Sequence, residues 1–324
     1  MLMKKFLLSL AVAMTAMFAA AQTKTYTDNL AINMDGTDMA PQQSSIIVKQ
    51  ENNGTYTLSL NNFIIHDSGM DMPVGNIVVN NISVTTDKGI KAFNVEQNIT
   101  IQPGDTENYW LGPYLGELPI SISGKMTEGS LYCSIGINMG ESIINVVFGT
   151  DINKTFSYDE DLIVTIDGES MEPQRTTIHV DEIANGTCTL ALNNFELPDM
   201  PIGNIILRGI TTRAENDVRK FATEQTIVIT NGDNDNVGWN GPLLGELPVS
   251  ISGKMTGYKL YCNIDIEMGQ TIINVKFGNE NLAGIENIAG EQNTKVIFDI
   301  TGRRIDTVTA PGIYIVNGKK VLVK

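Results

Sequence analysis

Apolar and polar residues alternate along most of this chain with a period of two. Between residues 118 and 126, leucine, isoleucine and methionine alternate with proline, serine and lysine. Successive side chains of a strand point to opposite faces, so this pattern predicts a strand with one apolar and one polar face. No window of ten or more residues shows the apolar stripe of an amphipathic helix. We therefore expect an all-β fold class.

The chain contains two copies of this pattern. Residues 115–127 recur as residues 244–256, with Val249 in place of Ile120 as the one difference. Matching segments cover most of each copy, and the small changes in offset fall in expected loops such as residues 66–71. The period is far too long for the unit of a solenoid, so we expect two tandem domains, each with its own core.

The alternation in the first copy predicts eight strands, near 25–34, 44–50, 55–62, 75–83, 93–102, 118–126, 130–138 and 142–149. Asn53-Gly54 and Asn185-Gly186 predict hairpins with type I′ turns, in which both central residues have positive φ. Such strands must hide one apolar face and their edges, either in a barrel or in a two-sheet sandwich. The spacing of neighbouring strands favours antiparallel eight-stranded up-and-down barrels.

The domain organisation follows from these signals. We expect a signal peptide at 1–21, a first barrel at 22–151, a second barrel at 152–279, a linker at 280–291 and a small C-terminal β module at 292–324. In the last segment, two short strands are expected to precede a hairpin about Asn317-Gly318.

The N-terminus has the pattern of an export signal. Two lysines, Lys4 and Lys5, precede an apolar stretch that is too short to span a bilayer. Three alanines then fit small-x-small cleavage after Ala21. The residue directly after the cleavage point is Gln22 and not a cysteine, and no later stretch predicts a transmembrane helix. We expect a protein that is secreted or exposed at the outer cell surface.

Charge and cysteine usage narrow the classes of partner. The net charge of −15 argues against nucleic acid and anionic membrane surfaces as partners, because both require a basic patch. We interpret the acidity as a means of solubility, with cation binding as the alternative. Cys133, Cys188 and Cys262 are in phase with apolar neighbours, which predicts buried thiols, and a Cys188–Cys262 disulfide is the alternative.

No catalytic constellation is visible. His66 and His179 do not recur between the copies, which excludes a duplicated histidine-based site. Glu117 and Glu246 do recur, and we interpret them as acceptors of backbone N–H groups where a strand begins. No sequence motif for a serine hydrolase, a zinc protease or a phosphate-binding loop is present. We therefore expect a non-enzyme with no catalytic residues and no cofactor.

Two further polar features have a structural interpretation. Lys125 and Lys254 are expected to pair with charges across the sheet. Residues 233–235 carry two aspartates that could bind Ca²⁺ through oxygen ligands, but a solvated turn is the favoured interpretation, and no metal site is expected.

Aromatic residues supply the candidate binding site. Tyr109 and Trp110 in the first copy, and Trp239 in the second, precede a Gly-Pro turn at the same place. Either these rings contact a ligand at the barrel rim, or they plug the barrel end. An eight-stranded barrel is at the size where side chains fill it or one small ligand fits, and we expect a filled or narrowly open interior.

Two families are similar to parts of the chain. The copies resemble calycin-like (lipocalin-like) β-barrel domains of secreted Bacteroidetes proteins, through Leu-x-Leu-x-Asn-Phe at 58–63, Met-Pro-x-Gly-Asn-Ile at 72–77 and Leu-Gly-Glu-Leu-Pro at 115–119. The resemblance implies barrels, and calycins as a class often hold small apolar ligands. The Gly-x-Trp of lipocalins is absent from the first strand.

The tail resembles a C-terminal sorting domain of the Bacteroidetes type IX secretion system. Residues 298–304 (Phe-Asp-Ile-Thr-Gly-Arg-Arg), the Pro-Gly-Ile-Tyr-Ile-Val segment at 311–316 and the terminal Lys-Val-Leu-Val-Lys carry the resemblance. It implies the secretion machinery as a partner. The expected function is an exported, non-enzymatic binding protein for a small apolar molecule or glycan. The alternative is a structural or adhesive surface module with filled barrels.

Overall fold

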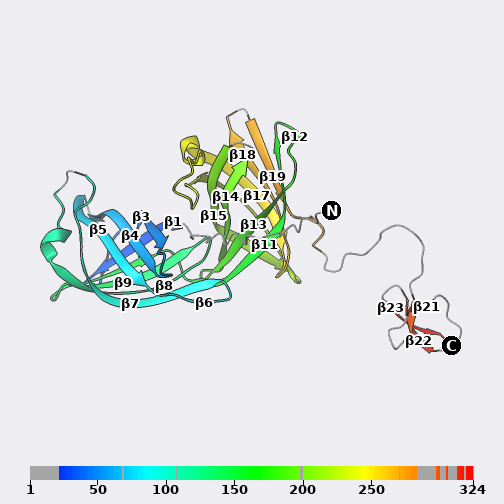
Figure 1. Cartoon of the computed structure of the whole chain (residues 1–324), viewed down its shortest axis with the longest axis horizontal. Coiled ribbons are helices and arrows are strands. Elements are labelled where there is room, and N and C mark those ends of the chain that lie inside the picture. The colour runs from blue at the N-terminus through cyan, green and yellow to red at the C-terminus, as the bar shows by residue number, and fades with distance from the viewer. Residues whose placement is uncertain are drawn as a thin grey trace, which may run out of the picture. The chain divides into compact units, whose positions relative to one another are not determined.

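Antiparallel strands form nearly all of the regular structure in the described chain (Figure 1). The computed structural model describes residues 22–67, 69–106, 109–197, 200–269, 271–282, 297–299, 304–305, 312–316 and 319–323. Within them the expected all-β class is confirmed. The chain divides into two compact units, Met1–Leu282 with both copies and Ala283–Lys324 with the tail. The predicted signal peptide and its cleavage site at Ala21 lie outside the described residues.

The first barrel contains every strand that the sequence predicts for it. Its elements are β1 (Thr23–Met34), β2 (Thr37–Asp38), β3 (Gln42–Gln50), β4 (Tyr56–Asp67), β5 (Met70–Ile82), β6 (Thr85–Asp87), β7 (Ile90–Thr100), η1 (Gly112–Leu115), β8 (Glu117–Met126), β9 (Leu131–Asn138) and β10 (Ile143–Phe148). The hydrogen-bonded order is β5-β4-β3-β1-β10-β9-β8-β7-β6, a meander in which neighbours in sequence are mostly neighbours in the sheet.

The second barrel repeats these elements. They are β11 (Ile152–Ile166), β12 (Glu169–Ser170), β13 (Gln174–Ile183), β14 (Thr187–Leu197), β15 (Met200–Glu215), β16 (Val218–Val228), η2 (Gly241–Leu244), β17 (Glu246–Met255), β18 (Leu260–Met268) and β19 (Thr271–Phe277). The pairing of β11 with β19 closes a ring of eight strands. The up-and-down barrel is therefore confirmed over the sandwich.

The two barrels differ at one seam. In the second barrel, β15 runs on without a break and pairs with β16. In the first barrel the matching segment is divided into β5 and β6, so that only β6 pairs with β7. An isolated bridge links Asn76 of β5 to Gln102, just after β7, and the second barrel has the equivalent bridge between Asn204 and Thr230. The first copy is thus a more open barrel than the second.

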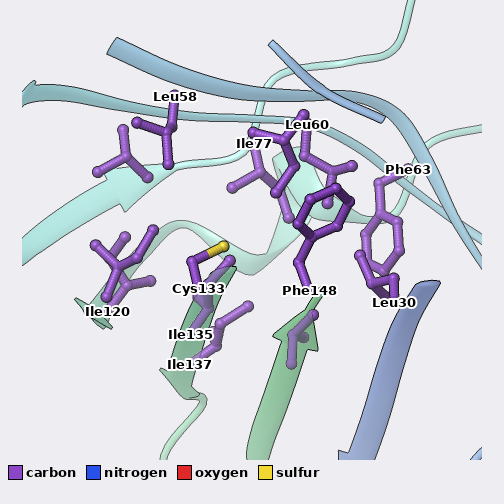
Figure 2. Close-up of a cluster of buried hydrophobic side chains, with 14 of the residues drawn as sticks. Leu30, Leu58, Leu60, Phe63, Ile77, Ile120, Cys133, Ile135, Ile137 and Phe148 are labelled. Atoms are coloured by element: carbon purple, nitrogen blue, oxygen red, sulfur yellow. The ribbon is translucent and has the colours of Figure 1, made fainter. Parts of the chain in front are cut away.

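Each barrel has its own apolar core, as the repeat predicts. The apolar residues that alternate between 118 and 126 are all buried, with Ile122 at 1% exposed, and Phe148 of β10 is 0% exposed. Figure 2 shows Phe148 and Phe63 among leucine and isoleucine side chains from several strands, with the Cys133 sulfur pointing into the same cluster. The second barrel forms a separate cluster around Phe277.

The hairpins between the second and third predicted strands form, but the predicted type I′ turn is wrong. Gly54 has a φ of 84°, whereas Asn53 is not in the left-handed region. The Gly54 N–H donates to Glu51 O at 2.9 Å, and the Asn53 carboxamide oxygen accepts from the Thr55 N–H at 3.0 Å, which holds this conformation. The second copy has the same contacts. A pair with both φ values positive occurs at Asp35-Gly36 instead, with 51° and 85°.

The prediction of a loop at residues 66–71 is also wrong. Strands β4 and β5 extend into this segment and pair with each other there. Ile65 faces Met72, and His66 faces Asp71.

In the tail, β20 (Ile297–Asp299), β21 (Arg304–Ile305), β22 (Gly312–Val316) and β23 (Lys319–Val323) form a small sheet in the order β21-β20-β22-β23. Val316 pairs with Lys319, which confirms the predicted hairpin there. None of the described residues forms a helix of the length and apolarity needed to cross a membrane.

Candidate functional site

The second barrel encloses a cavity of about 290 Å³ beside η2. Its lining is apolar apart from Asn240 and Thr271. Phe195 and Ile205 form part of one wall, and Val275 lies on another. A cavity of this composition offers very few hydrogen-bond partners, and it favours an apolar occupant over water.

The register of the strands explains why this lining is aliphatic. On β18 and β19, Ile266 pairs with Ile273 and Ile264 pairs with Val275. Alternate residues of both strands therefore point to the interior, where Ile266 and Val275 are 5% and 3% exposed. The period-two pattern of the sequence thus places one set of branched side chains against the cavity.

Flexible side chains surround the cavity where η2 lies. Met200 is 41% exposed, while Leu244 and Met268 are partly buried against the core. All three line the cavity. Methionine has several rotatable bonds and adapts its shape to a neighbour, so this rim can adjust to ligands of different outline.

Asn240 marks a difference between the barrels. Its side-chain amide donates to Pro201 O at 3.1 Å, and its carboxamide oxygen accepts no hydrogen bond from another described residue. The matching position of the first copy is Leu111, and Ser142 stands at the position of Thr271. A ligand in the second barrel would therefore meet a polar group at Asn240 that the first barrel lacks.

The two tryptophans recur at one loop position and are buried. Trp110 is 5% exposed and Trp239 is 9% exposed. Each indole N–H donates to a backbone carbonyl at 3.1 Å, on Thr106 and Asn234 respectively. The rings are not part of the lining of the described cavity. They anchor the loops that lead into η1 and η2, and direct ligand contact by these indoles stays a prediction.

Glycine is required beneath each indole. A Cβ atom added to Gly104 would lie 2.2 Å from Trp110 Cζ2, and the same distance separates a Cβ at Gly232 from Trp239 Cζ2. The ring therefore packs directly on the backbone. Tyr109, the third aromatic residue predicted for the site, is 65% exposed and stacks on Tyr114 with ring centroids 5.4 Å apart.

A polar triad recurs beside each of these loops, and sequence reasoning missed it. In the first barrel, Asn62 and Asn76 donate their amide N–H groups to the two oxygens of Asp105, at 3.0 and 3.1 Å. Asn194 and Asn204 bond Asp233 in the same way in the second barrel, at 3.2 and 2.8 Å. Each triad ties the β4–β5 or β14–β15 hairpin to the loop before the tryptophan.

The signal for the triads was present in the repeated segments. Asn62, Asn76 and Asp105 lie in motifs that recur in both copies. Asn62 has a φ of 53° and Asn194 a φ of 52°, a conformation that asparagine tolerates better than most residues. The spacing along the sequence gave no indication that the three side chains meet.

The sequence suggested that Asp233 lies in a solvated turn, but the structure buries this residue. It is 5% exposed, and Lys24 from the start of the first barrel places its ammonium 3.6 Å from Asp233 Oδ2. Lys24 also lies 3.0 Å from Glu128 Oε2. The Lys24 ammonium is thus a cation of the chain itself that pairs with Asp233. Among the described residues, no group of three or more acidic, histidine or cysteine side chains is placed to hold a metal ion.

Other buried polar contacts join the barrels. Thr127 Oγ1 donates to Asp181 Oδ2 at 2.7 Å, and Asp181 is fully buried. Burial raises the pKa of Asp181, and hydrogen bonds from hydroxyls, including that of Thr127, offset part of this rise. Asn193 donates to Glu128 O at 3.0 Å. Residues from both copies thus form one polar interface.

The remaining sequence-predicted residues have structural positions. Glu117 and Glu246 are exposed, and the predicted bonds to backbone N–H groups are not present among the described residues. Lys125 does not pair across the sheet as predicted. It lies 2.8 Å from Asp151 Oδ1 in the connection between the barrels. Lys254 approaches Glu280 at 3.8 Å, beyond the end of β19.

The three cysteines are buried and free, so the predicted buried thiols are confirmed over a disulfide. Burial raises the pKa of the Cys133 and Cys262 thiols to about 12. The histidines lie apart from each other and from the cavity. His66 Nδ1 is 2.6 Å from Asp71 Oδ1, and His179 Nδ1 is 2.9 Å from Ser157 Oγ.

The barrel architecture and the repeated motifs agree with comparisons to known proteins. The model of the calycin-like beta-barrel domain matches residues 23–151 and again residues 155–280. The chain belongs to the calycin-like β-barrel family. No curated protein matches it. The two calycin-like domains account for both copies of the repeat, and the calycin-like fold is that of a binding or surface protein.

Solved structures similar to this calycin-like chain are distant. One is a candidate outer membrane protein from Bacteroides fragilis, with 15% identity and a TM-score of 0.27, covering 79% of this chain and 97% of that chain. Another is a protein of unknown function from Nostoc punctiforme, with 10% identity and a TM-score of 0.18, covering 79% of this chain and 95% of that chain. The family match therefore carries the assignment by itself.

Proposed function

We propose that this protein is an exported binding protein that holds a small apolar molecule in its second barrel. The observation that carries the proposal is the cavity of about 290 Å³ with an almost wholly apolar lining. Transfer of a ligand from water into such a space is favourable by about 25 cal/mol for each Å² of apolar surface buried. A glycan is the weaker candidate here, because the lining has few hydrogen-bonding groups and both indole rings are buried.

The size of the cavity limits the ligand. Small-molecule sites are typically about 300–1,000 Å³, so this cavity falls at the low end and fits one fused ring system or a short branched chain. A single hydroxyl or carbonyl on the ligand would be placed best near Asn240 and Thr271, the polar residues of the lining. The adaptable methionines of the rim predict tolerance toward several ligands of similar size.

Export and the lack of enzymatic activity complete the proposal. The N-terminal segment that ends at Ala21 supports export, and the resemblance of the tail to a sorting domain supports a route through type IX secretion to the surface or the medium. The apolar lining contains no acid, base or nucleophile other than the Thr271 hydroxyl, which supports binding over catalysis.

A fluorescent apolar probe tests the site. N-phenyl-1-naphthylamine is titrated into the full mature chain and into two variants, Val275→Phe and Val146→Phe. These residues occupy the same position of the two barrels and are 3% and 2% exposed. Only Val275 lines the cavity of the second barrel. We expect Val275→Phe to weaken binding at least about tenfold, which corresponds to about 1.4 kcal/mol, and Val146→Phe to leave it unchanged.

Stability measurements provide the control for folding. A phenylalanine that enters an existing cavity needs little rearrangement, whereas overpacking of a filled core costs about 1–3 kcal/mol. We therefore expect Val146→Phe to be the more destabilising variant. Equal loss of probe binding in both variants, or no saturable binding by the wild type, would refute the proposal. The second result would favour the structural or adhesive module.

A further inference from the structure

A second hollow, of about 660 Å³, lies between the two barrels. The first barrel contributes residues of β1 and of turns, with Gln43 from β3 and Leu131 from β9, and the second contributes residues of β13 to β16 and the turns beside them. This inter-barrel cleft exists only because the two copies are joined, since neither barrel provides both walls. Ligand sites commonly occur at such boundaries between domains.

The chemistry of the cleft is opposite to that of the barrel cavity. Seven threonines and five asparagine or glutamine residues line it, together with one acidic and one basic side chain. Hydroxyls and amides both donate and accept hydrogen bonds, so they complement a ligand that also does both. Between them lie apolar side chains, among which Val228 is 54% exposed.

Arg208 is the central charged group of the cleft. Its guanidinium donates to Gly129 O at 3.2 Å and lies 4.0 Å from Asp28 Oδ2, both in the first barrel. Burial lowers the pKa of Arg208, and the neighbouring Asp28 opposes this effect. Gln225 bonds both the N–H and the carbonyl of Arg208, at 3.3 and 3.2 Å, which fixes its backbone.

Donor groups remain for a ligand. A guanidinium has five N–H donors, and the described protein groups accept one of the hydrogen bonds from that of Arg208. The Thr230 hydroxyl oxygen is buried at the cleft wall without a hydrogen-bond partner among the described residues. That oxygen has almost no accessible surface, so the donors offered to a ligand are those of Arg208, whose side chain is 28% exposed. Arg208 is not part of the repeated pattern, because Asn80 occupies the matching position of the first copy.

We propose that the inter-barrel cleft binds a neutral, hydroxyl-rich ligand of the oligosaccharide class. The carboxylate of Asp28 balances the charge of Arg208, and the net charge of −15 disfavours an anionic ligand. The alternation of hydroxyl, amide and small apolar side chains matches the mixed polar edges and C–H faces of sugar rings. The cleft lining contains no aromatic residue for stacking, so the affinity is modest.

The test uses neutral tetrasaccharides as probes. Cellotetraose, xylotetraose and maltotetraose are each titrated into the full mature chain by isothermal calorimetry and by saturation-transfer NMR. Val228→Arg places a long side chain at the cleft, and Ile272→Arg is the matched control, because Ile272 is 56% exposed on β19 and does not line the cleft. We expect at least one tetrasaccharide to bind, with a tenfold or greater loss in Val228→Arg and no change in Ile272→Arg.

The outcomes separate this site from the barrel cavity. Binding of the apolar probe should be the same in Val228→Arg as in the wild type, since Val228 lies outside the barrel lining. No saturable binding of any of the three tetrasaccharides overturns the proposal. Equal binding in both arginine variants overturns it as well, because the ligand would then lie elsewhere.

Discussion

The buried lysine between the barrels gives a quantitative prediction. Lys24 is 7% exposed, and its ammonium lies 3.0 Å from Glu128 Oε2 and 3.6 Å from Asp233 Oδ2. Lys24→Met keeps the length and apolar character of the side chain and removes the charge. The Asp233 carboxylate, itself 5% exposed, then remains buried without its cation.

The magnitude follows from the distance. Two unit charges 3.6 Å apart attract by about 4–5 kcal/mol at an effective dielectric constant of about 20. Part of this is offset, because the variant no longer buries an ammonium and because Asn194, Asn204 and Gln22 still donate to Asp233. We therefore expect Lys24→Met to lower the free energy of unfolding by about 3 kcal/mol, at the low end of measured losses for broken buried pairs.

Urea denaturation followed by tryptophan fluorescence measures this change. Lys49→Met is the matched control, because Lys49 forms a 3.3 Å pair with Glu51 in which both side chains are well exposed, at 46% and 33%. Exposed pairs contribute little to stability, so the control should unfold close to the wild type. Similar unfolding midpoints for the two variants would refute the reasoning, since the buried contact would then carry no more energy than a surface pair.

The remaining predictions concern a buried acid and a packed glycine. The folded-state pKa of Asp181 is raised above its unfolded value by burial, so the stability linked to this carboxyl is fully present below the unfolded pKa and is lost as pH rises through the folded pKa. Asp181→Asn should therefore gain stability relative to the wild type as pH rises above about 4, and a pH-independent difference in thermal unfolding would contradict this. Gly232→Ala should cost about 1–3 kcal/mol, because its Cβ would lie 2.2 Å from Trp239 Cζ2. Gly238→Ala is the control, with no atom within 4 Å of its Cβ, and equal stability of the two alanine variants would disprove the packing argument.

Local pattern was enough to predict the strands and their faces. Along β8, exposed and buried residues alternate from Glu117 to Met126 almost without a break, as period two requires. Turn types were less predictable. The Asn53-Gly54 pair has the composition of a type I′ turn, but a longer loop is stabilised by the Asn53 side chain, and composition alone does not show how many residues the loop contains.

The candidate sites could not be predicted from the sequence alone. The aliphatic residues around the cavity of the second barrel have close equivalents in the first, with Phe63 for Phe195 and Ile77 for Ile205. Whether such a set encloses space depends on side-chain volumes and strand placement that a linear pattern does not contain. The inter-barrel cleft depends on how two copies meet, so nothing in the linear pattern distinguishes Arg208 from other charged residues on strands.

The polar triads bear on how this architecture can grow. In the second barrel the triad around Asp233 receives Lys24, the second residue of the preceding barrel's first strand. In the first barrel the two matching asparagines, Asn62 and Asn76, bond Asp105, which is exposed to solvent. A further barrel placed ahead of this one would need a lysine in its opening strand to pair with Asp105, but the contacts of Asp181 and Arg208 would be missing, because the first copy has Lys49 and Asn80 at those positions. Gene duplication alone would therefore not reproduce this junction, and the two copies are adapted to be joined in one order.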